Sequence, residues 1–498
     1  MRSRTNSVTV LRRLLCFFIS CLILAGCGQA NPQMPAVGLN SDQTGFTVVG
    51  IGQYFEDTIV IPEIYSYYGS RGKVLEIDAH AFENCAELIA IQIPNTVQKI
   101  GKYAFSGCVG LMEIDLPDNL FTVDSYTFYQ CSGLSSVLIP NSVRMINDHA
   151  FAGCTSIESI DLPDNLAIID SYAFDGCLNL GGEIEITSSV NDYVFRNTAL
   201  KKVTAPGSFS IGAGPFSQCE DLVEVVLPEF MQQIGEGAFA DCTSLTNITM
   251  PDGMREEILS DRLFYNCTSL RSIQIPEGNV CRIGAEVFYN CDGLTKFTVP
   301  NYIRFIGDGC FYDCDGLQRV DFIYDAPSIY TGYMGGCNVG ASAFENCDNL
   351  TDVFITKGYY KFGADAFAGC ENLKNVFIDD LLTWFEVKFD NEKSNPMYYA
   401  DNLYLNGEPI TGTVHIGIGG SAVAVPPYIF KNCSGMTRLL LPWNISRIGT
   451  NAFEGCDDLI IEYPGTIAQW DAIEKDGWDN GLGKCVIECS DGDIYIGS

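Results

Sequence analysis

The chain has 498 residues, a length that would suggest several separate domains in an ordinary globular protein. Its 62 Asp and Glu residues outnumber its 29 Lys and Arg residues, which gives a formal net charge of −33. Because a nucleic-acid-binding protein needs a basic surface to meet the phosphates, this charge argues against a nucleic-acid partner. The acidic residues are spread along the whole chain, so we interpret them as a solvated surface rather than a cation-binding site.

The first residues have the pattern of a leader that is removed. Four Arg residues precede an apolar run from Leu14 to Leu24, which is too short for an ordinary membrane-spanning helix. The segment Leu24-Ala25-Gly26-Cys27 resembles the lipobox of bacterial lipoproteins. The resemblance implies a signal peptide over residues 1–26, a lipidated Cys27, and a membrane-anchored protein at the bacterial cell surface, outside the cytoplasm. The alternative is a plain secretory leader in which Cys27 is incidental.

Two further segments precede the regular part of the chain. Residues 27–45 are rich in Gly, Pro, Asn, Gln and Ser, a composition that predicts a flexible tether. Residues 46–76 contain two strand-like pieces, Phe46–Ile51 and Thr58–Pro62, but do not follow the period found further on. Because the first coil of a repeat array has no neighbour on one side, we expect residues 46–76 to form an N-terminal cap.

A unit of 23 residues dominates the rest of the chain. Its core is Phe-x-x-Cys-x-x-Leu, and the regularity predicts a solenoid. Residues 77–378 and 428–462 hold fourteen copies, and a degenerate fifteenth unit has Thr198 in place of Cys. The Phe/Cys pairs are 82/85, 105/108, 128/131, 151/154, 174/177, 216/219, 239/242, 264/267, 288/291, 311/314, 344/347, 367/370, 430/433 and 453/456.

The spacing within one unit predicts an α/β repeat with one short parallel strand per coil. Ile91 and Ile93 alternate with Gln92 and would share the inner face of the strand, which Pro94 ends. On the other side of the coil we expect irregular or short helical turns. The residue before each Cys is usually Gly or Asn, as at Gly107, and would adopt the left-handed conformation that closes such a turn.

Two segments near the end of the chain break the period. Residues 379–427 are rich in aromatic residues and contain Asn406-Gly407 between apolar runs, which predicts a hairpin within a small β-rich insert. Residues 463–498 predict a C-terminal cap, with a capping box from Thr466 to Gln469 that opens a short helix.

The cysteines and histidines of the repeat do not predict a chemical site. Stacked coils would hold neighbouring Cys side chains about 4.8 Å apart and parallel, which suits neither a zinc site nor a disulfide. We interpret the repeat cysteines as buried free thiols that act as small apolar spacers. The pairing of five other cysteines stays open: Cys281, Cys310, Cys337, Cys485 and Cys489. We expect no catalytic residue, metal or cofactor, and therefore no enzyme.

The units resemble the BspA-like leucine-rich repeats of bacterial surface proteins, as in the run from Ile234 through Ala238, Phe239 and Cys242 to Pro251. The resemblance covers about residues 46 to 498. It implies a leucine-rich-repeat array that binds host matrix proteins, host cells or other bacteria.

Candidate ligand-binding residues lie where the exposed side chains change from coil to coil. A face of this kind predicts a surface for a macromolecular partner, and a purely structural array is the simpler alternative. A second function is a glycan-binding or glycan-processing lipoprotein that uses the aromatic insert, unless those aromatics only cover the core. The candidates are Gln92, Glu113, Asp115, Glu158, Asp161, Lys296, Lys374 and Phe377 in the repeats, with Trp384 and Tyr398 in the insert.

Overall fold

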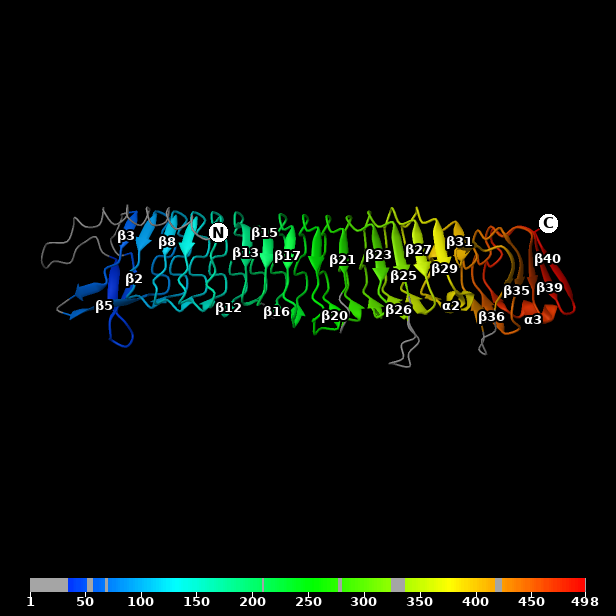
Figure 1. Ribbon diagram of the computed structural model, residues 1–498, viewed down its shortest axis with the longest axis horizontal. Helices are drawn as coiled ribbons and strands as arrows, with labels where there is room; N and C mark the ends of the chain where they lie inside the picture. Colours follow the sequence, from blue (N-terminus) through cyan, green and yellow to red (C-terminus); the bar gives the residue numbers. More distant parts are fainter. Residues whose placement is uncertain are drawn as a thin grey trace.

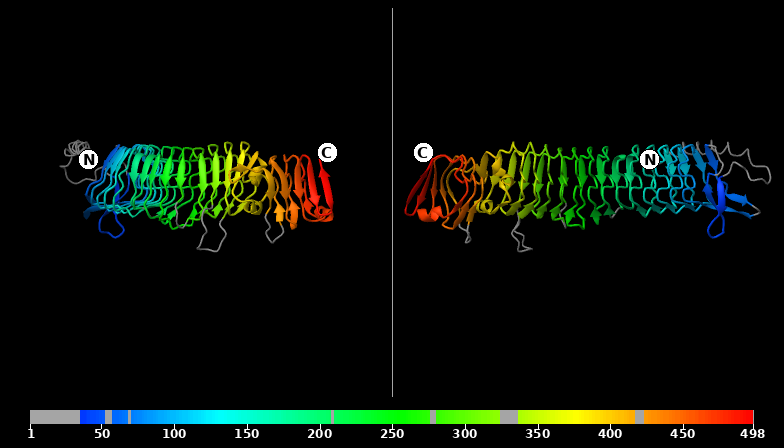
Figure 2. Two further views of the ribbon diagram at one scale, coloured as in Figure 1. Left: turned by 45° about the vertical axis from the view of Figure 1, so that its right-hand side comes forward. Right: turned by 180° about the vertical axis from the view of Figure 1, so that it is seen from behind.

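The computed structural model describes residues 35–51, 57–67, 70–207, 210–275, 280–323, 336–416 and 423–497. Cys27, the predicted leader and the first part of the predicted tether lie outside these residues. The described chain forms a rod of about 17 turns that runs in sequence order from one end to the other (Figure 1). The two further views of Figure 2 show the same rod, with the coils stacked side by side along its length.

One strand of each coil adds to a main row of parallel sheets along the rod. Its outer and inner positions alternate, so that apolar residues such as Ile91 and Ile114 are buried while their neighbours face water. The row is divided into four sheets. They contain β3 (Thr58–Val60), β6 (Ala90–Gln92), β8 (Glu113–Asp115) and β10 (Ser136–Leu138); β13 (Gly181–Glu185), β15 (Ala199–Thr204), β17 (Glu224–Val226), β19 (Asn247–Thr249) and β21 (Ser272–Gln274); β23 (Lys296–Val299), β25 (Arg319–Phe322), β27 (Asp352–Ile355), β29 (Asn375–Ile378) and β31 (Asn402–Leu405) with β32 (Glu408–Pro409); and β33 (Gly412–His415), β35 (Met436–Leu440), β37 (Leu459–Glu462), β39 (Cys485–Cys489) and β40 (Gly492–Ile496).

A second row of short parallel strands lies on the other side of the coils, where we expected irregular or helical turns. The prediction of one strand per coil and of an α/β class is therefore wrong, because residues such as Lys99 and Ile100 pair with Glu76 and Ile77 of the preceding coil instead of only turning the chain. Figure 1 shows this row along the lower edge of the rod. The row contains β7 (Lys99–Ile100), β9 (Thr122–Val123), β11 (Met145–Ile146), β12 (Ile168–Ile169), β14 (Ser189–Val190), β16 (Ser210–Ile211), β18 (Gln233–Ile234), β20 (Ile258–Leu259), β22 (Arg282–Ile283), β24 (Phe305–Ile306), β26 (Gly336–Val339), β28 (Tyr359–Phe362), β30 (Lys388–Phe389), β34 (Val423–Val425), β36 (Ile445–Ile448) and β38 (Glu474–Lys475).

The segment around each repeat Phe is a pair of turns and not a helix. In one coil, the N–H of Ser106 donates to Tyr103 O at 3.1 Å and the N–H of Cys108 donates to Phe105 O at 3.1 Å. Gly107 has φ of 73°, so the predicted left-handed position before each Cys is confirmed. A second left-handed position, at Tyr103 with φ of 59°, was not predicted.

Stacked Phe rings fill the centre of the rod. Thirteen rings from Phe82 to Phe367 lie nearly parallel, with centroids 5.1 to 5.9 Å apart. A fully buried Phe contributes about 1.5–3 kcal/mol relative to an exposed one. Since every ring contacts the ring of the next coil, the core is continuous along the stack.

The repeat cysteines are free and mostly buried, and they also form hydrogen bonds. Twelve of them donate the thiol proton to the Phe carbonyl oxygen of the preceding coil, at Sγ to O distances of 2.9 to 3.2 Å. Burial raises the pKa of Cys177 to about 12, so its thiol keeps its proton at neutral pH. The interpretation of these residues as apolar spacers was therefore incomplete.

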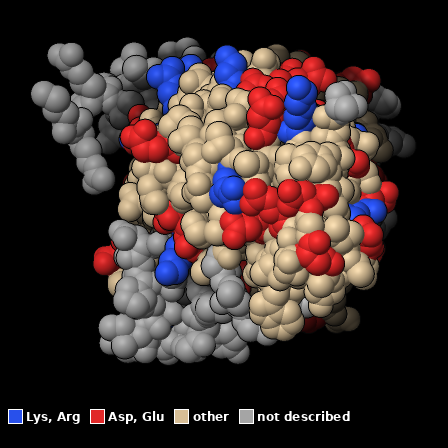
Figure 3. All heavy atoms as spheres, turned by 90° about the vertical axis from the view of Figure 1, so that its right-hand side faces the viewer, with Lys and Arg blue, Asp and Glu red and all other residues tan. Residues whose placement is uncertain are grey.

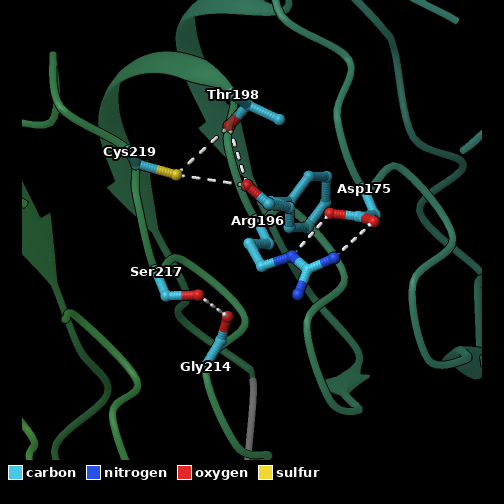
Figure 4. A network of polar contacts seen from close by, with 7 residues as sticks. Asp175, Arg196, Thr198, Gly214, Ser217 and Cys219 are labelled. Carbon is cyan, nitrogen blue, oxygen red and sulfur yellow. Dashed lines mark hydrogen bonds and ion pairs between the residues drawn. The ribbon is translucent and has the colours of Figure 1, made fainter. Parts of the chain in front are cut away.

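The degenerate coil departs from this pattern. Thr198 Oγ1 donates to its own coil's Phe195 O at 2.9 Å and lies 3.3 Å from Cys219 Sγ, as Figure 4 shows for the labelled side chains. In the same coil Arg196 forms a bidentate pair with Asp175, with both N to O distances at 2.8 Å.

The segment 379–427 continues the stack instead of interrupting it. After α2 (Leu381–Glu386), β30 pairs with β28 and β31 pairs with β29, each in parallel. The short 3₁₀ helices η1 (Glu392–Ser394) and η2 (Pro396–Tyr398) replace the usual turns. The prediction of a separate insert is wrong, whereas the Asn406-Gly407 hairpin is confirmed by the antiparallel pair β31–β32.

Antiparallel strands close both ends of the rod. At the start, β1 (Ala36–Leu39) pairs with β2 (Phe46–Gly50), and β4 (Ile64–Tyr67) pairs with β5 (Ser70–Ile77). The tether prediction is therefore wrong for residues 36–39, which form a strand. At the other end the capping box of α3 (Ile467–Asp471) is confirmed, and β39 and β40 form the last hairpin.

Candidate binding face

The outer face of the sheet formed by β23, β25, β27, β29 and β31 carries two lines of side chains that interact from strand to strand. The strands pair in parallel with matched positions, which places Thr298, Asp321, Phe354, Phe377 and Tyr404 in one line across the sheet. A second line contains Lys296, Arg319, Asp352, Asn375 and Asn402. We call the two lines together the binding face.

A carboxylate with two cations anchors one end of the binding face. Asp321 is only 1% exposed although it lies on the outer side of the sheet. Its Oδ1 lies 2.6 Å from Arg319 Nε and its Oδ2 lies 2.7 Å from Lys296 Nζ. Both cations remain about half exposed, so a partner can reach them. The carboxylate fixes their positions because it is shared between two neighbouring strands.

Aromatic rings form the middle of the binding face. The rings of Phe354 and Phe377 stack with centroids 4.1 Å apart, and Phe377 and Tyr404 follow at 4.7 Å. The guanidinium carbon of Arg319 lies 3.6 Å from the centroid of Phe354, which extends the stack to the Asp321 cluster. All three rings are half-buried, so their outer edges stay available for contact.

A row of polar side chains runs beside the rings. Asn402 Nδ2 donates to Asn375 Oδ1 at 3.1 Å, and Asn375 Nδ2 donates to Asp352 Oδ1 at 2.8 Å. Thr351 Oγ1 donates to the other carboxylate oxygen of Asp352 at 2.8 Å. The surface is therefore held in one arrangement before any partner arrives, which lowers the entropy cost of binding.

The predicted ligand-binding residues do not form one site. Lys296 and Phe377 belong to the binding face, and exposed Lys374 precedes Asn375 at its border. Gln92, Glu113 and Asp115 are exposed on β6 and β8, eight or nine coils from β23 at the edge of the binding face, which is roughly 40 Å at about 4.8 Å per strand. Glu158 and Asp161 are exposed in a coil where no main strand forms.

Two aromatic residues of the segment 379–427, Trp384 and Phe385, lie inside the rod. Trp384 is 0% exposed, and its Nε1 donates to Ile429 O at 3.2 Å. Phe385 packs against Phe430, with ring centroids 5.6 Å apart. Tyr398 is half-buried between Tyr399 and Tyr428. Trp384 therefore has no surface for a glycan, and its role as a ligand-binding candidate is corrected to one in the core.

Sequence reasoning missed Arg319, Asp321, Phe354 and Tyr404. The signal that could have found them is the alignment of the units, because each occupies the same strand position as a residue already selected in another coil. Asp321 corresponds in register to Phe354, and Phe354 to Phe377. The five cysteines whose pairing was left open, Cys281, Cys310, Cys337, Cys485 and Cys489, are free thiols.

Charge on the remaining surface is mixed but mainly acidic. Figure 3 shows acidic side chains over the C-terminal end of the rod, with basic side chains set among them. Arg438 on β35 pairs with Glu462 at 2.9 Å and with Glu488 at 2.7 Å, which joins three neighbouring strands. Hydrogen bonds that Arg438 donates to Glu488 and Glu462 raise the pKa of Arg438. Such pairs leave the acidic excess largely unchanged.

The described residues hold neither a cluster of metal ligands nor a membrane-spanning helix. Over the described ranges, His, Cys, Asp and Glu form no group of three placed to hold a metal ion. Within that same part of the chain, every helix is too short or too polar to cross a membrane.

The stacked coils define the class of leucine-rich repeat solenoids, and a solved structure has the same fold. A leucine-rich repeat protein from Bacteroides ovatus covers 93% of this chain and 100% of its own, with a TM-score of 0.54 and 22% identity. A leucine rich cell surface protein from Faecalibacterium prausnitzii covers 91% of this chain and 99% of its own, with a TM-score of 0.39 and 20% identity. A leucine-rich repeat protein of T. pallidum covers 44% and 92%, with a TM-score of 0.32 and 24% identity. A search of curated proteins gave no match.

The family follows from the sequence match. The sequence model of the family described as "BspA type Leucine rich repeat region (6 copies)" matches residues 75–192, 188–318, 337–391 and 412–472, which is more than half of the chain. The protein therefore belongs to the family of BspA type leucine-rich repeat proteins, and the resemblance seen in the repeat unit is confirmed.

Proposed function

We propose that this chain is a non-enzymatic binding protein of the bacterial cell surface, anchored through a lipid on Cys27. Its binding face contacts a macromolecular partner, either a protein of the host matrix or a surface of a host cell or another bacterium. The lipid anchor rests on the order of charged, apolar and small residues before Cys27. The rod would then project from the membrane as an extended platform for adhesion.

One observation carries this proposal. Arg319 stacks on Phe354, and the rings of Phe354, Phe377 and Tyr404 follow one another across the sheet. The binding face thus exposes ring edges and a cation beside hydrogen-bonded polar side chains. Aromatic residues and Arg supply most of the energy in known protein interfaces. The face is also continuous over five strands, which suits a large partner better than a metabolite.

The test uses the mature chain, residues 28–498, and a panel of immobilised extracellular matrix proteins and whole cells. A variant with Phe354→Ala, Phe377→Ala and Tyr404→Ala should lose at least tenfold in affinity for any partner found. The matched control carries Met112→Ala and Leu138→Ala, two exposed apolar residues near the N-terminal end of the rod. Equal loss in both variants, in proteins with unchanged circular dichroism, would contradict a role for the binding face.

The anchor has its own test. Metabolic labelling with a tagged fatty acid should label the wild-type protein and not the Cys27→Ala variant. A labelled Cys27→Ala variant, or an unlabelled wild type that is still exported, would point to the plain secretory leader instead.

A further inference from the structure

A groove of about 640 Å³ opens on the outer side of β17 and β19, outside the binding face. Its walls are the outer residues of the two strands and the loops that follow them, from Leu227 to Phe230 and from Met250 to Gly253. A volume of this size lies in the range of pockets that hold ligands.

The groove exists because the two strands separate at their carboxyl ends. β17 and β19 pair only at Glu224 with Asn247 and at Val225 with Ile248. The pairs on either side, β15–β17 and β19–β21, continue for one more position. Val226 and Thr249 are therefore not paired, although the loops after them meet again where Phe230 lies over Gly253.

An exposed aromatic ring forms one side of the groove. Phe230 is 65% exposed, and Val226, which also lines the groove, is 41% exposed. Phe230 lies over Gly253, where a Cβ atom would come within 2.5 Å of Phe230 Cδ1 and 2.6 Å of Glu229 O. The missing side chain of Gly253 thus lets the ring lie close to the next coil. Burial of this apolar surface by a partner would be favourable at about 25 cal/mol per Å².

Acidic side chains surround the apolar wall. Glu224, Glu229 and Asp252 line the groove, and all three are exposed. Lys202 pairs with Glu224 at 3.1 Å, which leaves the rim with an acidic excess. The net charge of −33 adds a long-range field that attracts cations.

We propose that this groove docks a short extended peptide segment of a partner protein, in which an apolar side chain stands beside a Lys or Arg. The apolar side chain packs between Val226 and Phe230, and the cation lies against Glu229 and Asp252. This site is separate from the binding face, so it stands or falls independently of the proposed adhesion function.

The probe is a fluorescein-labelled octapeptide of alternating Leu and Lys, measured by anisotropy against residues 28–498. Two control peptides alternate Leu with Glu and Gly with Lys. The Leu-Lys peptide should bind at least tenfold more tightly than either control, and its affinity should fall as salt rises. Equal binding of the Gly-Lys peptide would show general attraction to an acidic protein and would overturn the proposal.

Variants locate the binding on the rod. Phe230→Ala, and separately Glu229→Gln with Asp252→Asn, should each weaken the Leu-Lys peptide at least fivefold. Gly253→Ala should also weaken it, because the new methyl group displaces Phe230. The matched controls are Phe121→Ala, a ring that is 58% exposed elsewhere on the rod, and Glu113→Gln with Asp115→Asn. Losses of the same size in these controls would overturn the assignment to the groove.

Discussion

The thiol of Cys154 donates a hydrogen bond to the carbonyl oxygen of Phe128 in the preceding coil, with an Sγ to O distance of 3.1 Å. The same contact recurs along the rod, so each coil satisfies a buried acceptor of its neighbour. A small apolar residue could fill the space of the thiol but would leave that oxygen with one donor, the N–H of Cys131 at 3.1 Å, in place of two. The choice of Cys at this position thus follows from hydrogen bonding as well as from size.

Replacement of this thiol should therefore be costly in the middle of the stack. Cys154→Ala should lower the free energy of unfolding by about 1–2 kcal/mol, from one lost hydrogen bond and a small cavity. Cys85→Ala is the control, because Cys85 is only half-buried and its sulfur lies 4.0 Å from Glu83 O. Urea unfolding of both variants checks the prediction, and equal losses would contradict it.

The same thiols should make the protein sensitive to alkali. Burial raises the pKa of Cys177 to about 12 and that of Cys219 to about 11, whereas a thiol in the unfolded chain ionises near pH ~8.5. Because the pKa is raised in the folded state, the buried neutral thiol contributes fully to the free energy of unfolding below pH ~8.5. That contribution is lost as the pH rises toward 12.

Between pH ~8.5 and its raised pKa, each such thiol should reduce the free energy of unfolding by about 1.4 kcal/mol per pH unit. Urea midpoints measured from pH 7.5 to 10 should therefore fall steeply above about pH 8.5. Cys177→Ala should show a shallower decline than the wild type. A midpoint that stays constant to pH 10 would rule out this linkage.

Trp384 should act as a core residue. Trp384→Ala should cost about 3–5 kcal/mol, because a fully buried indole with a hydrogen bond to Ile429 O is removed. Trp443→Ala, at a position that is 69% exposed, should cost less than about 0.5 kcal/mol. Thermal unfolding of the two variants separates these cases, and the reverse order would place Trp384 at the surface.

Asp321 should hold the cationic end of the binding face. Asp321→Asn should destabilise the protein by about 1–3 kcal/mol, less than a fully buried pair because Arg319 and Lys296 both reach water. Asp115→Asn, at the corresponding exposed position of β8, should have no measurable effect. The comparison is made by urea unfolding at low and high salt, and a loss that is equal at both positions would contradict the assignment.

Much of the fold could be predicted because the same residue pattern recurs in every unit of the repeat. The strand at Ile91, the left-handed position at Gly107 and the hairpin at Asn406-Gly407 each have a local signal that one coil suffices to interpret. The second row of strands had no such signal, since a pair such as Lys99–Ile100 is too short to show alternation and pairs only with other coils.

The sequence by itself determined the solenoid, the continuous Phe core and the repeat family, because these depend on spacing and on residue types that recur every 23 positions. Only the tertiary structure decided which exposed residues meet. Asp321 joins Arg319 and Lys296, and Phe230 covers Gly253, through contacts between coils. Such contacts depend on the register of neighbouring strands and on where two strands separate, and neither is written in any single repeat.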